Sequence, residues 1–171
     1  HDTNFYGLSA QTLGIDKDSL LIEEGIAVNS TASLDYSDAE AVKVLGNPTE
    51  GALLLWLKKA GVDYLNLRES AEVLEELPFS TERKYMATIV KSSLFEGKTI
   101  LYVKGAPEIV SGLCKNIENN VSKTDIENQL VEYQNQAMRT LGFAYQIIDS
   151  KADVFKDGKI DIHGGGQDLK F

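Results

Sequence analysis

A run of apolar positions, interrupted once by a polar turn, predicts a β-hairpin in the middle of the chain. Residues 85–91 and 98–103 are rich in Ile, Val, Tyr and Thr, and residues 92–97 join them. Antiparallel pairing about a turn centred near Leu94 sets Lys84 opposite Lys104 or close to it. Like charges across a ladder repel, so this pairing, with an aromatic residue just upstream, predicts a site for an anion that carries a flat ring, such as a nucleotide.

Helical periodicity and capping residues predict helices on both sides of this hairpin. Asn47 is the expected N-cap of one helix, Pro48 its first residue, Glu50 its third-position carboxylate and Gly61 its end. Three further helices are expected over about 20–28, 63–76 and 107–119, the first capped by Asp18 and Ser19. A fourth is expected over 124–141, with a capping box at 124–127 and Gly142 as its stop. The expected strands are an edge strand within 30–36 and a strand at 143–148. Residues 1–17 show no clear period, and residues 149–171 are expected to be a polar, Gly-rich loop or linker.

Length, charge and composition narrow the classes of function. The chain has 171 residues, 43% hydrophobic and 25% charged, as expected for one soluble globular domain. A formal net charge of -9 argues against a nucleic-acid binder, because phosphate-backbone affinity needs a surplus of Lys and Arg. The single cysteine, Cys114, excludes an internal disulfide and favours a reducing compartment. The chain has no apolar run near the ~18 residues of a membrane helix and no signal-peptide pattern at its start, so we expect no direct membrane contact.

Four candidate residues each have a structural and a functional interpretation. Phe79 is either a core aromatic or a platform on which a base stacks. Lys84 and Lys104 are either solvated lysines at strand ends or a paired anion site, and Gly105 beside them allows close backbone approach. Arg139 either complements a helix C-terminus or binds a phosphate or ribose. Glu50 likewise either closes its capping box or points from the first helical turn at a ligand.

Four motifs, in this order, resemble the nucleotide-binding domain of type II P-type cation-transporting ATPases, with calcium pumps the nearest likeness. The motifs are Gly46–Leu53 (GNPTEGAL), Phe79–Met86 (FSTERKYM), Lys104–Glu108 (KGAPE) and Arg139–Ala144 (RTLGFA). The resemblance covers about residues 44–148 and implies an α+β fold in which helices flank an antiparallel β-sheet. It also implies a single nucleotide-binding domain over residues 1–171, with its core at about 18–150 and an exit segment at 151–171.

The resemblance implies a role for each matching residue. Phe79 stacks on adenine, Glu50 bonds the adenine edge, and Lys84, Lys104 and Gly105 line the base pocket and the phosphate path. Arg139 contacts the phosphate side, and Leu141 packs near the ribose or base. The sequence departs from the best-known animal calcium pump at Thr81, where that pump has an arginine that reaches the phosphates. Arg83 is a candidate to compensate for that arginine.

The chain lacks the family's Asp-Lys-Thr-Gly-Thr phosphorylation motif. Phosphoryl transfer needs an acceptor and a metal held in line, so we expect this chain to bind ATP without hydrolysing it. We expect it to be part of a pump at the cytoplasmic face of a membrane, where phosphorylation and actuator domains are its partners and the phosphorylation domain supplies most of the Mg²⁺ contacts. The alternatives are a freestanding kinase or nucleotide hydrolase, and a protein-interaction domain whose pocket has decayed.

Overall fold

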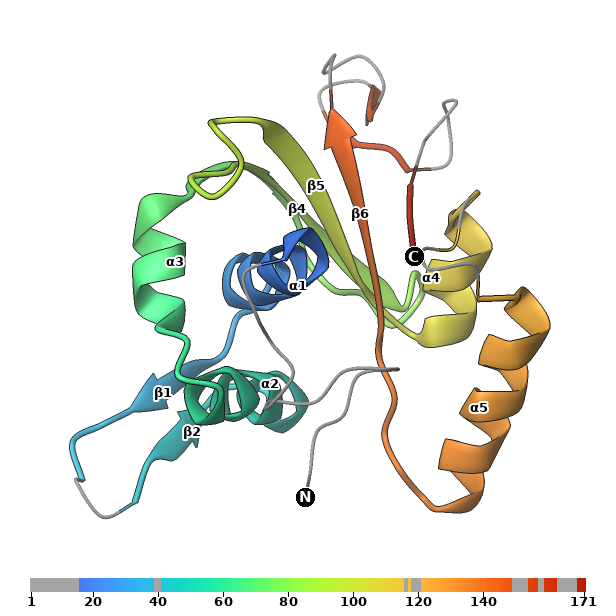
Figure 1. Ribbon diagram of the computed structural model, residues 1–171, viewed down its shortest axis with the longest axis horizontal. Helices are drawn as coiled ribbons and strands as arrows, with labels where there is room; N and C mark the ends of the chain where they lie inside the picture. Colours follow the sequence, from blue (N-terminus) through green and yellow to red (C-terminus); the bar gives the residue numbers. More distant parts are fainter. Residues whose placement is uncertain are drawn as a thin grey trace. The chain divides into compact units, whose positions relative to one another are not determined.

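The computed structural model describes residues 16–38, 41–115, 117, 121–148, 154–156, 159–162 and 169–171. Residues 1–15 and the Gly-rich segment 163–168 lie outside this range. The chain divides into two compact units, residues 1–71 and residues 72–171. Together the described residues form helices and antiparallel sheets, which confirms the predicted α+β class (Figure 1). None of the described helices combines the length and the apolar composition that a membrane crossing requires.

The first unit consists of three helices and a two-stranded hairpin. Its elements are α1 (Lys17–Val28), β1 (Ser33–Asp35), β2 (Lys43–Leu45), α2 (Pro48–Lys59) and α3 (Tyr64–Ser70). The strands β1 and β2 pair antiparallel beside α2, and α1 packs against α3 (Figure 1). Asn47 caps α2 and Pro48 is its first residue, as predicted. The cap of α1 is Asp16 rather than Asp18 or Ser19, because the Asp16 carboxylate accepts the Ser19 N–H at 3.0 Å.

The second unit is built on a four-stranded antiparallel sheet. Its elements are β3 (Glu72–Leu77), β4 (Tyr85–Lys91), β5 (Thr99–Gly105), α4 (Pro107–Leu113), α5 (Lys123–Asn135), β6 (Gly142–Ile148), β7 (Phe155–Lys156) and β8 (Lys159–Ile160). The strand order is β3-β4-β5-β6, and β7 pairs with β8. The predicted central hairpin and the strand near 143–148 are therefore confirmed.

The predicted helix over residues 63–76 is wrong in its second half. Helix α3 ends at Ser70, and the chain then enters β3, which pairs with β4 through a register shift between Val73 and Glu75. The Glu and Leu residues of this segment are good helix formers, but Leu74 and Leu77 pack against the hydrophobic core from the strand. Tertiary packing therefore outweighs local propensity here.

The register of the central hairpin differs by two residues from the one predicted. Tyr85 faces Gly105 and Met86 faces Lys104, so Lys84 lies opposite Ala106. The turn is centred near Phe95, one residue later than predicted, because the Ser92 N–H bonds the Lys98 carbonyl at 2.8 Å and the Gly97 N–H bonds the Ser92 carbonyl at 2.9 Å. A shift of two residues preserves the side-chain alternation, so the residues predicted to face the core still do so.

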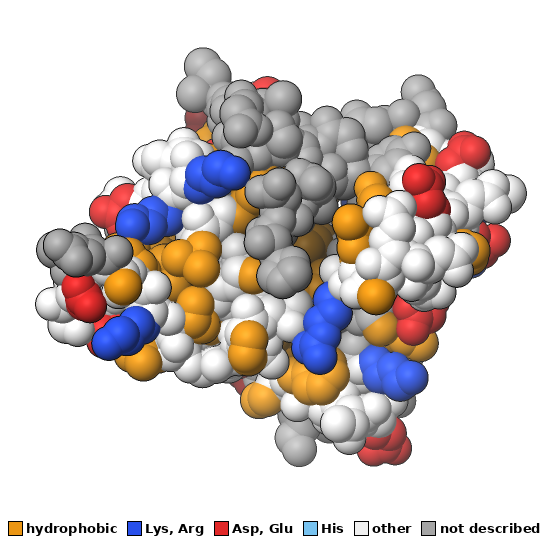
Figure 2. All heavy atoms as spheres, turned by 90° about the horizontal axis from the view of Figure 1, so that it is seen from below, with side chains coloured by type: hydrophobic (Ala, Val, Ile, Leu, Met, Phe, Trp, Pro, Cys, Tyr) orange, Lys and Arg blue, Asp and Glu red, His pale blue; other side chains and the backbone are white. Residues whose placement is uncertain are grey.

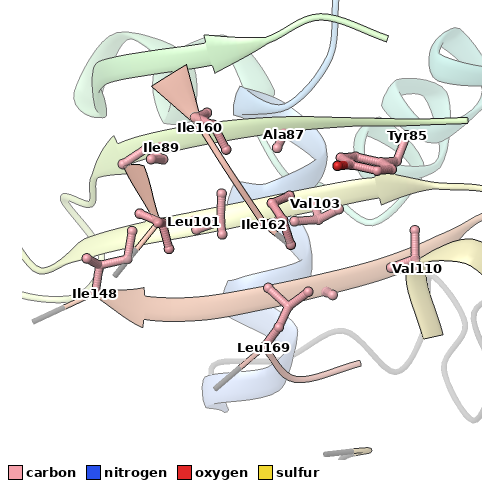
Figure 3. Packing of buried hydrophobic residues seen from close by; sticks show 12 residues of the cluster. Tyr85, Ala87, Ile89, Leu101, Val103, Val110, Ile148, Ile160, Ile162 and Leu169 are labelled. Carbon is pink, nitrogen blue, oxygen red and sulfur yellow. The ribbon is translucent and has the colours of Figure 1, made fainter. Parts of the chain in front are cut away.

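One face of the sheet carries the hydrophobic core of the second unit. The side chains of alternate residues on β4, β5 and β6 meet Val110 of α4 and apolar residues of the C-terminal segment (Figure 3). The core includes Tyr85, Ala87, Ile89, Leu101, Val103, Val110, Ile148, Val154, Ile160, Ile162 and Leu169. The described part of residues 149–171 thus supplies core side chains and two short strands, where a polar loop or linker was expected. The isolated apolar residues among its glycines and charges gave too weak a period to reveal this.

Both helices that follow the central hairpin are shorter than predicted. Helix α4 ends at Leu113, and α5 begins at Lys123 after its N-cap Ser122, whose side chain forms a capping box with Asp125. Helix α5 ends at Asn135, because Ala137 adopts a left-handed conformation (φ 56°) and the Met138 N–H bonds the Tyr133 carbonyl at 3.0 Å. Residues 136–141 therefore form a loop that leads into β6.

Candidate functional site

The start of β4, the end of β5 and the start of β6 lie side by side at one end of the four-stranded sheet. Tyr85 at the start of β4 faces Gly105 at the end of β5, which in turn faces Gly142 at the start of β6. The loops that precede β4 and β6 therefore join the sheet at this same end. We call this end of the strands, with its loops, the β4–β6 edge. Most of the predicted site residues lie in its strands and loops: Phe79, Lys84, Lys104, Gly105, Arg139 and Leu141.

Gly105 is required at this edge because the neighbouring chain passes too close for a side chain. A Cβ atom on Gly105 would lie 2.3 Å from the Lys84 carbonyl oxygen and 2.6 Å from the Tyr85 Cα. The same carbonyl accepts a hydrogen bond from the Ala106 N–H at 2.9 Å. The close approach predicted at Gly105 is thus an approach of the protein's own backbone, which joins Lys84, just before β4, to Ala106, the N-cap of α4.

The loop of residues 78–84 presents Phe79 to solvent. Phe79 is 57% exposed, so the interpretation as a core aromatic is wrong. The loop turns sharply, since Lys84 has a left-handed backbone (φ 61°) and donates its N–H to the Ser80 carbonyl at 2.7 Å. Figure 2 shows one face of the molecule, on which basic and hydrophobic side chains both reach the surface. An exposed aromatic ring and an exposed lysine in one short loop suit a ligand that is aromatic at one end and anionic at the other.

The two lysines of the predicted pair occupy different environments. Lys84 is exposed, whereas Lys104 is 4% exposed and faces Met86 on one side and Phe143 on the other. The interpretation as a solvated strand-end lysine is therefore wrong for Lys104. A largely buried ammonium group needs polar partners, so its position suits short-range contacts better than long-range attraction of an anion.

Arg139 and Leu141 lie in the loop between α5 and β6. Arg139 is exposed and lies outside α5, which ends at Asn135. The interpretation in which Arg139 complements the C-terminus of this helix required it in the last turn and is therefore wrong. Leu141 is half-buried and directly precedes Gly142. Gly142 itself has no room for a side chain, because a Cβ atom there would lie 2.9 Å from the Pro107 Cα. This packing fixes the point at which the loop enters the sheet.

Glu50 lies in the first unit, and hydrogen bonds within that unit hold its carboxylate. Its Oε2 accepts from the Thr31 N–H at 2.9 Å, the Thr31 hydroxyl at 2.8 Å and the Ala32 N–H at 3.1 Å. Glu50 is 7% exposed, and Asn47 rather than Glu50 provides the side-chain cap of the first turn of α2. The structural role of Glu50 is therefore to hold the loop that follows α1, instead of the expected capping box.

Arg68 of α3 binds the same stretch of backbone, and sequence reasoning missed it. Its guanidinium donates to the carbonyl oxygens of Ala27 at 2.5 Å, Ala32 at 2.8 Å and Ser30 at 3.3 Å. The Tyr64 ring lies 4.8 Å from the guanidinium carbon. Burial lowers the pKa of Arg68, while Tyr64 and the carboxylate of Glu50 act in the opposite direction. The spacing of Tyr64 and Arg68 by one helical turn was the available signal.

Two further features bear on possible ligands. Within the described part of the chain, no group of three or more His, Cys, Asp or Glu side chains is arranged to hold a metal ion. The first unit has a shallow hollow of about 330 Å³ beside Tyr36, Lys58 and Asp63, with the Lys58 ammonium 5.6 Å from the centre of the Tyr36 ring. No predicted site residue lines this hollow.

Comparison with known families identifies the group to which the chain is related. Residues 19–163 match the family model described as P-type ATPase, cytoplasmic domain N. This match covers well over half of the chain. The chain therefore belongs to the P-type ATPase N-domain family. The resemblance carried by the four sequence motifs is thereby confirmed.

Several relatives of this N domain are calcium-transporting ATPases. The chain is 34% identical over 134 residues to the calcium-transporting ATPase PAT1 of Dictyostelium discoideum, covering 74% of this chain and 12% of that protein. It is 33% identical over 137 residues to calcium-transporting ATPase 1 of Lactococcus lactis, covering 75% of this chain and 15% of that protein. It is also 30% identical over 162 residues to calcium-transporting ATPase 2 of Cryptococcus neoformans, covering 83% of this chain and 11% of that protein. The N domain thus spans between a tenth and a sixth of the length of these relatives.

Proposed function

We propose that the β4–β6 edge of this N domain binds ATP and presents it to the phosphorylation domain of a cation pump. The observation that supports the proposal is the register Tyr85–Gly105–Gly142, because the segments that carry the exposed Phe79 and the basic residues adjoin that end of the sheet. Because the relatives are calcium-transporting ATPases, calcium is the proposed cation. The proposed location is the cytoplasmic face of a membrane, with the actuator domain as a further partner.

In this proposal, the base is held by stacking and the phosphates by positive charge. The ring of Phe79 stacks on adenine, which contributes on the order of 1–3 kcal/mol. Lys84 and Arg139, both exposed, attract the phosphates, while the buried Lys104 lines the pocket of the base. Leu141 packs near the ribose or base.

The proposed roles of Gly105 and Glu50 depend on contacts that these residues already make within the protein. Gly105 contributes to the nucleotide site by letting the backbone of Lys84 and Tyr85 pass close beside it. Glu50 bonds the adenine edge, and to do so its carboxylate needs to share acceptor capacity that the Thr31 and Ala32 N–H groups now use. A carboxylate has about four lone-pair positions, so a further donor is chemically acceptable.

The reaction itself is assigned to the phosphorylation domain. This chain contains no Asp-Lys-Thr-Gly-Thr motif, so we propose that it binds ATP without hydrolysing it. Phosphoryl transfer also requires Mg²⁺ in line with the acceptor, and most of its ligands are proposed to come from the phosphorylation domain. A phosphate-release assay on the isolated chain tests this part. Steady release above the buffer rate would favour a freestanding nucleotide hydrolase.

Calorimetric titration of the chain with ATP, ADP and AMP tests nucleotide binding. We expect saturable binding of all three, with a Kd of roughly 0.1–1 mM for ATP. Phe79→Ala should raise the Kd by about 5- to 150-fold, which corresponds to a stacking loss of 1–3 kcal/mol. Phe95→Ala is the matched control, because Phe95 lies in the turn at the opposite end of the same hairpin. Absence of binding with all three nucleotides would instead favour a protein-interaction domain.

A further inference from the structure

The side chain of Arg83 closes the loop that carries Phe79. Its Nη2 donates to the Pro78 carbonyl at 2.5 Å, so the guanidinium spans the loop from one end to the other. The backbone N–H of Arg83 donates to the Ser80 hydroxyl at 3.1 Å, and the backbone N–H of Lys84 donates to the Ser80 carbonyl at 2.7 Å. These bonds fix both ends of the loop around the exposed Phe79.

The charge of Arg83 acts on the interior of the second unit. Arg83 is half-buried, and its Nε is a buried donor without a hydrogen-bond partner. Burial raises the pKa of the Tyr85 hydroxyl, and the positive charge of Arg83 opposes that rise, while Asp161 adds to it. The side chain of Arg83 is thus more buried than that of the neighbouring Lys84, which is exposed.

We propose that Arg83 is a positioning residue for the base-stacking ring, and that it does not bind the phosphates. The hydrogen bond to the Pro78 carbonyl sets the backbone immediately before Phe79, and thus the direction in which the ring leaves the loop. This inference rests on the proposed nucleotide function of the β4–β6 edge. It replaces the expectation from sequence that Arg83 compensates for the arginine absent at Thr81.

The first test needs no nucleotide. In Arg83→Met, which keeps the length of the side chain but removes its donors, the Lys84 amide should exchange with solvent about tenfold faster. The amides of β4 and β5 should remain protected, which shows that the sheet is folded. Arg83→Lys should not restore protection, because a single ammonium lacks the planar fork. Lys98→Met, at the opposite end of the hairpin, is the matched control. Unchanged exchange at Lys84 in Arg83→Met would overturn the proposal.

The second test separates positioning from phosphate binding. A positioning residue acts through Phe79, so Arg83→Met should weaken ATP, ADP and AMP by the same factor, about three- to tenfold. A phosphate ligand would instead give the largest loss with ATP and the smallest with AMP, and that gradient would overturn the proposal. If the unsubstituted chain binds no nucleotide, the proposed function fails, whereas the exchange measurement still decides whether Arg83 holds the loop.

Discussion

Glu50 and Arg68 of the first unit direct their charged groups at their own backbone, whereas Phe79, Lys84 and Arg139 of the second unit present exposed side chains at a sheet edge. Both sets include basic residues, so residue type alone does not tell which set binds a ligand. The difference lies in burial and exposure. Glu50 and Arg68 satisfy buried backbone groups and so stabilise the fold, whereas Phe79, Lys84 and Arg139 are exposed to solvent.

This comparison also separates two kinds of constraint on a site. At the β4–β6 edge the constraint is steric, because Gly105 and Gly142 leave no room for Cβ atoms. In the first unit the constraint is polar, because backbone groups of residues 27–32 depend on Glu50 and Arg68. Substitutions at the two places should therefore lower the free energy of unfolding for different reasons and by different amounts.

The largest effect is expected from Gly105→Ala. The new methyl group would meet the Lys84 carbonyl and the Tyr85 Cα at less than 3 Å, and backbone atoms there cannot move aside without breaking the ladder. We expect a loss of about 3 kcal/mol or more in the free energy of unfolding, measured by urea denaturation, together with loss of nucleotide binding.

Gly112→Ala is the matched control for this substitution. Gly112 lies in α4, and a Cβ atom there would meet nothing within 4 Å. Alanine is a better helix former than glycine, so the control should gain about 0.5–1 kcal/mol. Equal stability of the two variants would show that the β4–β6 edge is looser than its geometry indicates.

The next largest effect is expected from Glu50→Ala. This substitution removes the acceptor of the Thr31 and Ala32 N–H groups and should lower the free energy of unfolding by about 2–3 kcal/mol. Glu50→Gln keeps one acceptor oxygen and should lose about half as much. Exposed Glu69, on α3 of the same unit, provides the control Glu69→Gln.

Glu50 also sharpens the comparison between the two units. If Glu50→Gln leaves stability unchanged and weakens ATP binding, its hydrogen bonds to residues 31 and 32 are not its main role. If it lowers stability and leaves the affinity of the folded protein for ATP unchanged, the proposed contact with the adenine edge is wrong.

Local signals predicted the parts of the fold that local interactions determine. The hairpin β4–β5, the cap at Asn47 and the strand β6 were predicted because β-branched runs and capping side chains act within a few residues. Strand β3 was predicted as a helix because its Glu and Leu residues favour a helix locally, while its pairing with β4 joins residues 10 to 19 positions apart. The core residues at 154–169 were missed for the same reason, since their partners lie on distant strands.

The candidate site divides in the same way. Sequence motifs predict Phe79, Lys84, Lys104 and Arg139 as site residues, which stays a prediction, and the register of the sheet places their segments at one edge. The hydrogen bonds of Glu50 and of Arg83 to backbone groups could not be predicted, because a carboxylate or guanidinium in a motif has the same sequence signature in either role. Only the contacts distinguish a ligand-binding group from one that holds a loop.

A smaller effect is expected from Ser122→Ala at the start of α5. The Ser122 side chain accepts from the Asp125 N–H, and the Asp125 carboxylate accepts in return from the Ser122 N–H. Ile126 is the only buried residue among those described in α5, so this helix relies on its cap more than on packing. Loss of the cap should lower the free energy of unfolding by about 1 kcal/mol. Thr124→Ala is the control, and an equal loss there would mean that the capping box lies at Thr124 after all.

The smallest effect is expected from the pH dependence of Glu23 in α1. Burial, reinforced by the negative charge of Asp16, raises the pKa of Glu23. The folded state therefore binds this proton more tightly than the unfolded state. The stabilising contribution is complete below the unfolded pKa, near 4.3, and is lost as pH rises through the raised folded value.

Glu23→Gln removes this titration and should therefore be more stable than the unsubstituted chain at pH 7 but not at pH 4. The gain follows the raised pKa of the buried Glu23, so it should grow as the pH rises from 4 to 7. Urea midpoints at several pH values between 4 and 8 measure the difference, and Glu69→Gln again serves as the exposed control. A gain that is equal at pH 4 and pH 7 would mean that Glu23 does not titrate in this window.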